Sequence, residues 1–317
     1  MNKARLLLMV ALLGVGLSAW GEIAISILDI EPGVRTVGMG GAAVALVPSA
    51  ETLYYNAAGL SELPGISFSS FYASHLGAAS YTAMDLTVRN VGIGVLMVSS
   101  GSIPGYDDEG NSTEDLSYGS TAFLLGFGFG SSQLPFLPAL PLDFSIGGRI
   151  KGLSVTCGTE KGAGFALDLA YQMRFADLSF GPVGLSDVGF GLTVTNLIGS
   201  IGYSDRSESF PMDLRLGGAA RIANIVLVAA DLELAGRAHL GVEVQAVEAL
   251  AVRVGILSQA GGISLSFGAG FGMEGLHLDY AYLTHPSLGG SHRISLTIDF
   301  GGLNLAGIGR ALRNLLP

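Results

Sequence analysis

The sequence predicts an all-β fold, a transmembrane antiparallel β-barrel of about 14 strands with an N-terminal plug or hatch segment. Three observations predict it. Polar and apolar residues alternate with a period of two through most of the chain, which is typical of strands. The alternating segments are mostly 8 to 14 residues long, which suits tilted membrane-spanning strands of about 9 to 11 residues. Although 49% of the 317 residues are hydrophobic, the chain offers no helix-compatible apolar run of about 20 residues.

The first element is a predicted signal peptide over residues 1–21. Two basic residues precede the apolar run Leu6–Leu17, and small residues lead to a cleavage site after Gly21. The single cysteine, Cys157, lies far from this segment, so the sequence predicts neither lipid attachment there nor an internal disulfide. The mature chain is therefore expected to begin at residue 22.

The second predicted element, residues 22–64, does not alternate. Its stretch Gly33–Ala45 is dense in small residues, which let backbone segments approach closely, as a segment folded inside a barrel requires. Barrels of about 8 strands are filled by their own side chains and those of 16 to 18 leave a water channel, so fourteen strands enclose a space that something must fill. We expect residues 22–64 to fill it as a plug or hatch.

The barrel itself is predicted over residues 65–300. Bacterial barrels have an even number of antiparallel strands, an apolar outer band and a polar lumen. The predicted strands are Ile66–Ser74, Ser80–Val88, Val91–Ser99, Tyr118–Phe129, Leu142–Val155, Ala163–Phe175, Val188–Asn196, Met212–Arg221, Ile225–Leu234, Arg237–Ala246, Leu250–Leu257, Ile263–Phe271, Leu276–Leu283 and His292–Phe300.

Charged side chains keep to one face of each predicted strand, which we assign to the lumen, since Lys or Arg on the lipid face would cost roughly 2 to 4 kcal/mol near the midplane. The lumen-facing charges are Arg149, Lys151, Asp168, Arg174, Arg215, Asp231, Glu233, Arg237, Glu243, Arg253 and Asp279. They form structural pairs with one another and with Arg35 and Glu51, or they line a substrate path. The glycines predicted on the same face, which make room in the lumen, are Gly147, Gly217, Gly241, Gly255 and Gly268.

The last predicted strand ends in the alternating stretch Ser295–Phe300, which resembles the terminal signal read by the barrel-assembly machinery. Residues 301–317 follow as a C-terminal periplasmic tail. Leucine and isoleucine recur in the tail at helical spacing, from Leu305 to Leu315, which predicts a short amphipathic helix.

Short motifs spread over the mature chain resemble those of a known family. They lie at residues 196–199, 210–217, 279–282 and 291–296, and in the N-terminal segment. In the N-terminal segment the matching residues are Arg35, Gly38, Met39, Gly40, Gly41, Tyr54, Tyr55, Asn56, Gly59 and Leu60. In this order and spacing the sequence resembles the FadL-like outer-membrane proteins, and more closely the PorV/PorQ group, which is UPF0164-like. The resemblance implies a fourteen-stranded barrel of the bacterial outer membrane whose matching N-terminal residues form a lumen plug and gate.

The function that the resemblance implies is a passive channel for hydrophobic small molecules such as long-chain fatty acids. An alternative is a PorV-like role in type IX secretion, in which the barrel binds exported protein cargo, and a purely structural barrel is a third. We expect outer-membrane lipid, lipopolysaccharide and the barrel-assembly machinery as partners, and no cofactor. Because 26 acidic residues stand against 16 basic ones, we expect no binding to nucleic acid.

Candidate chemistry in the sequence is confined to one loop. The five histidines are scattered and no nucleophile motif occurs, so we expect no enzymatic activity. The carboxylates of the predicted loop 101–117 are Asp107, Asp108, Glu109, Glu114 and Asp115. Their oxygens offer ligands for a divalent cation that bridges to lipopolysaccharide, and the alternative is a solvated outer loop.

Overall fold

The computed structural model describes residues 27–30, 32–46, 49–75, 79–134, 143–175, 177–180, 183–287 and 289–304. The predicted signal peptide and residues 305–317 of the predicted tail lie outside the described residues. None of the described helices is long and apolar enough to cross a membrane.

Sixteen strands follow the helical turns of the N-terminal part. The helical turns are η1 (Ile27–Asp29), α2 (Val34–Gly38), α3 (Thr52–Tyr55), η2 (Ala57–Glu62) and, later in the chain, η3 (Ser131–Gln133). The strands are β1 (Ser67–His75), β2 (Ala79–Val88), β3 (Val91–Ile103), β4 (Leu116–Gly130), β5 (Asp143–Cys157), β6 (Glu160–Arg174), β7 (Leu178–Phe180), β8 (Val183–Gly202), β9 (Ser207–Ser209), β10 (Asp213–Ile222), β11 (Val226–Glu233), β12 (Ala238–Val247), β13 (Leu250–Gln259), β14 (Gly262–Met273), β15 (Leu276–His285) and β16 (Gly289–Asp299).

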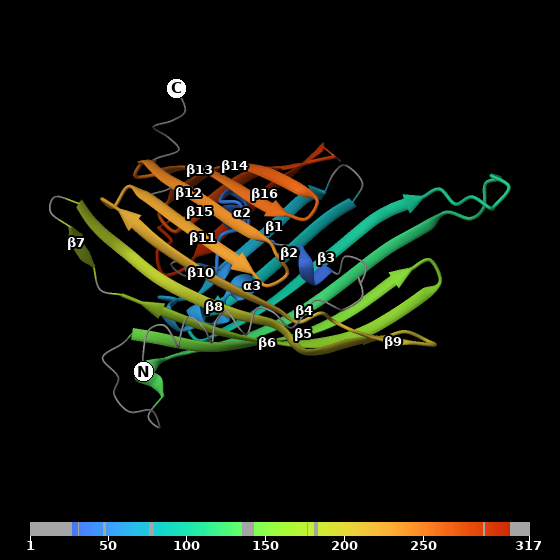
Figure 1. Cartoon of the computed structure of the whole chain (residues 1–317), viewed down its shortest axis with the longest axis horizontal. Coiled ribbons are helices and arrows are strands. Elements are labelled where there is room, and N and C mark those ends of the chain that lie inside the picture. The colour runs from blue at the N-terminus through green and yellow to red at the C-terminus, as the bar shows by residue number, and fades with distance from the viewer. Residues whose placement is uncertain are drawn as a thin grey trace.

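The strands form one closed antiparallel barrel (Figure 1). Each strand pairs with the next around the ring, and β1 pairs with β16 to close it. The short strands β7 and β9 pair only with β8, so the ring contains the other fourteen strands. The predicted all-β barrel of about 14 strands is confirmed.

Burial alternates along the strands, as the sequence pattern predicts. In β11, Asp231 is 1% exposed whereas its neighbour Leu232 is 64% exposed. The same alternation of buried and exposed positions runs through β13 and β14. Large apolar side chains thus cover the outer wall, where hydrocarbon rather than water is the favourable surrounding, and polar ones face the lumen.

The largest difference from the predicted strands lies in β8, which the sequence predicts only from Val188 to Asn196. The strand extends from Val183 to Gly202, and a bulge shifts the register of its pairing with β6. Leu167 lies opposite Ile198, yet Leu169 lies opposite Val194. Asn196 takes a positive φ of 53° within the bulge. The two extra residues on β8 interrupt the alternation at this point, since Asn196 is buried whereas Ile198 is exposed, so periodicity alone ends the strand there.

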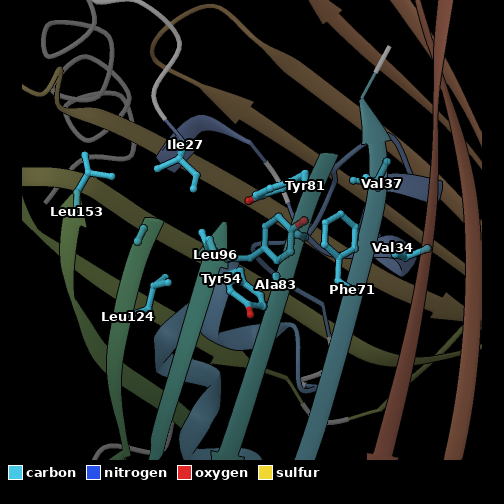
Figure 2. Packing of buried hydrophobic residues seen from close by; sticks show 14 of the residues in the cluster. Ile27, Val34, Val37, Tyr54, Phe71, Tyr81, Ala83, Leu96, Leu124 and Leu153 are labelled. Carbon is cyan, nitrogen blue, oxygen red and sulfur yellow. The ribbon is translucent and has the colours of Figure 1, made fainter. Parts of the chain in front are cut away.

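The described residues from 32 to 63, which are all but 47 and 48, are here called the inner segment and lie inside the barrel. Figure 1 shows α2 and α3 of this segment surrounded by strands. Most of its side chains are buried, and Val34, Met39, Leu53 and Leu60 are fully so. Figure 2 shows part of the cluster in which Val34, Val37 and Tyr54 meet residues of β1–β4. The barrel therefore has a filled lumen.

The two ends of the barrel differ. β1 begins and β16 ends at one end, here called the terminal end. Residues 104–115 and 203–212 lie at the other, the long-loop end, where the hairpins β3–β4 and β5–β6 project beyond the other strands (Figure 1). β4, β5 and β6 have 15 residues each, against 8 to 10 in β10–β13. The barrel wall is thus tallest on one side.

Candidate functional site

Glycines of the barrel wall provide the seat for the inner segment. A Cβ on Gly255 of β13 would collide with the backbone of Gly40, and one on Gly241 of β12 with that of Met39. Gly40 and Gly41 turn sharply there, with φ of 70° and 86°, a conformation that favours glycine. The inner segment therefore approaches this wall backbone to backbone, which only glycine permits.

Wall side chains also satisfy backbone groups of the inner segment. Arg149 donates to the carbonyls of Leu53 and Tyr54, and Arg215 donates to that of Gly41. Gln172 donates to the carbonyl of Leu46, at 3.0 Å. Because the segment contains only short helical turns, most of its polar groups have no helical partner. The lumen charges thus replace the hydrogen bonds that regular secondary structure would supply.

One ion network joins the inner segment to β12, β13 and β15. Arg35 contacts both carboxylate oxygens of Glu243, each at 2.9 Å, and Arg253 contacts Glu243 at 2.7 Å and Asp279 at 2.5 Å. Burial alone would lower the pKa of Arg35, but Glu243 raises it more, so the guanidinium stays charged. Glu51 accepts the backbone N–H groups of Arg35 and Thr36.

A second network lies on β5, β6 and β8. Asp168 accepts from Arg149 at 2.7 Å and from Lys151 at 2.7 Å. Its carboxylate also accepts the backbone N–H of Asn196 at 2.8 Å, and the side chain of Asn196 accepts from Lys151 at 2.7 Å. These contacts hold the β8 bulge against the neighbouring strands.

A third network surrounds the glycine turn of the inner segment. Asp231 accepts the N–H groups of Ala43 and Val44, at 2.7 and 3.1 Å, and pairs with Arg215. His239 lies 2.8 Å from the carbonyl of Gly40 through Nδ1 and 2.8 Å from Glu233 through Nε2. Arg237 pairs with Glu233 at 2.5 Å, at the more exposed edge of the network.

The remaining predicted residues belong to the inner segment, except Arg174, which belongs to β6 beside it. Arg174 donates to the carbonyls of Ala45 and Leu46 and pairs with Glu62. Asn56 donates to the carbonyls of Val44, at 2.7 Å, and Tyr171, at 3.1 Å. The other residues of the N-terminal motif also contact their surroundings closely. Gly38 approaches Gly268 of β14, and the Tyr55 hydroxyl accepts from the N–H of Gly33. The N–H of Gly59 donates to the carbonyl of Asn56, and Leu60 is fully buried.

A cavity of about 190 Å³ lies between the inner segment and the wall, towards the long-loop end. Its apolar lining comes from Leu28, Ile30 and Tyr54 on one side and from Leu96 and Leu124 on the other. Burial, and then nearby Asp85, raises the pKa of Tyr54 well above its usual value, so the phenol stays neutral.

The cations that line this cavity are paired, and the lining carboxylate of Asp213 accepts the backbone N–H of Ala235 at 3.0 Å. Lys151 and Arg149 share Asp168, whereas Arg215 and Arg237 both contact Glu233. An ion entering the cavity would compete with existing pairs, while an uncharged apolar molecule would not. The arrangement therefore suits a neutral ligand.

The acidic loop is organised by hydrogen bonds. Asp107 accepts from the N–H groups of Glu109 and Asn111 and from the Asn111 amide, and these bonds lower the pKa of Asp107. Asp115 accepts from Ser102 instead. Over the described ranges, no three His, Cys, Asp or Glu side chains form a group that could hold a metal ion. The carboxylates of the loop are therefore not brought together.

Several residues that contact the inner segment are absent from the charge pattern. Ser266 accepts from the N–H of Gly40 and donates to the carbonyl of Gly38. His239, Gln172 and Asn196 hold backbone or charged groups, as described above. Ser266, His239 and Gln172 lie on lumen faces, so strand phase places them in the lumen, whereas the bulge turns Asn196 inward against the phase of β8. Only the contacts show what they hold.

Comparison with solved structures gives the same fold. The chain resembles two crystal structures of the Pseudomonas putida toluene transporter TodX, with TM-scores of 0.55 and 0.53 and identities of 12% and 13%. The first alignment covers 86% of this chain and 99% of TodX, and the second covers 86% and 98%. A Pseudomonas aeruginosa FadL homologue gives a TM-score of 0.51 at 10% identity, over 85% of this chain and 98% of that one.

No known family profile and no curated protein matches the sequence. The likeness is therefore one of architecture, at identities far below those that carry residue roles across. The chain has the fold of a FadL-like barrel.

Proposed function

We propose that this protein is a passive channel of the bacterial outer membrane for small uncharged hydrophobic molecules. The observation that carries the proposal is the cavity, whose apolar side is completed by polar side chains and by cations that are each paired. The outer wall supports the location, because its exposed large apolar side chains suit a bilayer. TodX, which has a similar fold, is a toluene transporter.

The size of the cavity favours a ligand of about one ring. A cavity of about 150 Å³ lined by apolar side chains is known to hold benzene. The cavity here is of similar volume, about 190 Å³. We therefore favour a single-ring hydrocarbon over a long-chain fatty acid, whose carboxylate would also need a free cation.

The route onward runs along β3 and β4. Below the cavity, Leu53 and Leu60 of the inner segment fill the space over the wall glycines Gly92 and Gly126. These side-chain contacts are apolar, so their separation breaks few hydrogen bonds, among them the one from the Asn90 N–H to the Leu60 carbonyl at 2.8 Å. A molecule would pass from the cavity between the inner segment and this wall towards the terminal end.

The cavity is tested by filling it. Purified wild-type protein should bind toluene, and benzoate, which is similar in size but charged, should bind far more weakly. Leu124→Trp should abolish toluene binding because the larger side chain occupies the cavity. Calorimetric titration measures both ligands, and a folded, heat-modifiable band on a gel shows that the barrel is intact.

The matched control is Leu265→Trp, since Leu265 lies exposed on the outer wall. It should bind toluene like the wild type. Equal affinity for benzoate and toluene, or full toluene binding by Leu124→Trp, would refute the proposed site.

A second candidate function, the PorV-like binding of exported proteins, is favoured by the projecting hairpins. β3–β4 and β5–β6 extend beyond the other strands (Figure 1), and residues 99–117 of the first hairpin are mostly polar. Shortening β3–β4 by removing residues 102–117 should then abolish co-purification of secreted proteins while leaving toluene binding intact. Absence of any secreted protein on the wild-type barrel would dismiss this candidate.

A further inference from the structure

A hollow of about 350 Å³ lies on the outer wall of the barrel, across β2–β5 and towards the long-loop end. Its outward-facing lining includes Thr82, Ser99, Gly119, Thr121, Ser154 and Thr156. These residues are neighbours across the sheet: Gly119 lies opposite both Ser99 and Thr156, and Thr121 lies opposite Ser154. Hydroxyl groups line most of the hollow, Met97 lies between Thr82 and Thr121, and no charged side chain lines it.

The hollow lies at the edge of the apolar band. Phe123 of β4 is 64% exposed. It lies two residues from Thr121, towards the terminal end. Met84 of β2 and Ile150 of β5 are also exposed on this lower part of the wall. An exposed aromatic at the rim of an apolar band is typical of the interface between lipid tails and headgroups. The hollow therefore lies at headgroup level.

Its hydroxyls are available for a ligand. Among the described residues, no hydrogen bond joins the side chains of Thr82, Thr121, Ser154 or Thr156 to the rest of the protein, and only weak contacts of 3.4 Å involve Ser80 and Ser99. Hydroxyl groups without partners are unfavourable against hydrocarbon, because nothing there can bond to them. A polar partner is needed at this place on the wall.

Gly119 gives the hollow its depth. A Cβ on Gly119 would find only the carbonyl of Val98, at 4.0 Å, so nothing in the protein occupies the space in front of it. The residue has no need of glycine for its own conformation, since its φ is not in the left-handed region. The absent side chain leaves room for a ligand group between Ser99 and Thr156.

The chemistry of the lining indicates the ligand. Hydroxyls both donate and accept, which matches the hydroxyl and amide groups of a sugar. Exposed Lys161 of β6 lies directly opposite Thr156 on the outer face and adds one cation at the rim, which suits a phosphate. Below, Phe123 and Ile150 offer an apolar surface for acyl chains.

We propose that this hollow binds the phosphorylated, acylated amino-sugar headgroup of an outer-leaflet glycolipid. The sugar lies against Gly119 among the hydroxyls, the phosphate faces Lys161, and the chains run along the apolar wall. The inference rests on the outer-membrane location proposed above, but it concerns the opposite face of the wall from the channel.

Native mass spectrometry of the purified barrel in detergent tests it, with lipid A as the probe and phosphatidylethanolamine as the comparison lipid. The wild type should prefer lipid A by about tenfold, as expected for a few hydrogen bonds. Thr121→Val combined with Thr156→Val removes two hydroxyls at nearly constant shape, and Gly119→Ile fills the hollow. Both variants should lose the preference.

The matched control is Gly218→Ile, since Gly218 also faces outward and its Cβ would find only one carbonyl, of Gly189 at 3.9 Å. It should keep the preference for lipid A. A wild type that does not distinguish the two lipids, or hollow variants that are folded and still prefer lipid A, would overturn the inference. Toluene binding should be unchanged in all three variants, so loss of the channel function and loss of the lipid site are separately visible.

Discussion

The inner segment meets two different walls. Against β10–β14 it lies on glycines and is held by buried ion pairs and hydrogen bonds to its backbone. Against β1–β4 its contacts are mainly apolar, since Tyr54 shares a cluster with Phe71 and Leu96 (Figure 2) and Leu53 lies over Gly92, Gly94 and Gly126. Leaving the first wall would break buried ion pairs and several hydrogen bonds, whereas leaving the second exposes mainly apolar surface and breaks the bond from the Asn90 N–H to the Leu60 carbonyl. We therefore propose that the contact with β10–β14 is fixed and that the contact with β1–β4 opens.

The polar wall should be the more sensitive to mutation. Asp231→Ala removes the acceptor of Ala43, Val44 and Arg215, and loss of one partner of a buried pair costs about 3–5 kcal/mol. Urea unfolding from lipid vesicles should show this loss. The same change at exposed Asp205 should have almost no effect. Equal stability of the two variants would mean that the polar wall does not hold the segment.

The apolar wall should respond differently. Leu53→Ala removes a fully buried side chain over Gly92 and Gly126, with an expected loss of about 2–5 kcal/mol. It should also speed toluene entry into vesicles, because the void lies on the proposed route. Stopped-flow uptake measures the rate, with Leu265→Ala on the outer wall as the control. A slower rate in Leu53→Ala would place the route elsewhere.

A smaller effect is expected at the glycine seat. Gly255→Ala should cost about 1–3 kcal/mol, since its Cβ meets the backbone of Gly40 and the segment must shift. Gly218→Ala, on the outer wall, meets open space and should be neutral. The difference in urea midpoint between the two variants reports how tightly the inner segment packs against Gly255. Equal midpoints would contradict this tight packing.

The smallest effect concerns Glu51, which is 8% exposed. Burial, and then repulsion from Asp279, raises the pKa of Glu51 above its ordinary value of 4.5. The folded protein therefore binds this proton more tightly than the unfolded chain does. As pH rises from the ordinary pKa through the raised one, the stability of the wild type should fall relative to Glu51→Gln. Urea midpoints of both proteins over that range give the sign, and a relative gain for the wild type would contradict it.

The sequence alone predicts the barrel because lipid and lumen impose opposite demands on alternate residues. Leu232 and Asp231 show this directly, as neighbours with opposite exposure. The pattern fails at Asn196, because a bulge of two extra residues turns this side chain inward, although Thr193 and Ile201 on either side of it keep the same phase. The short strands β7 and β9 lie outside the ring. The sequence does not predict them because three residues carry no detectable alternation.

The candidate site is less predictable. Phase places Arg149, Arg215 and Asp231 in the lumen, but it leaves open whether they line a path or hold the inner segment. The contacts place them on the segment's backbone. The cavity depends on how Tyr54 and Leu124, which both line it, come together across some 70 residues of sequence, and pairings at that distance are not encoded in local spacing.

We propose that molecules pass where the inner segment lies on the apolar wall, β1–β4. A Cβ on Gly126 would lie 3.8 Å from that of Ala57, a distance that suits a disulfide. Ala57→Cys with Gly126→Cys, in a Cys157→Ser background, can therefore fasten the segment to β4. Toluene uptake should fall sharply when the pair is oxidised and recover on reduction, while each single variant is indifferent to redox state. Equal uptake by the oxidised and reduced protein would contradict the account.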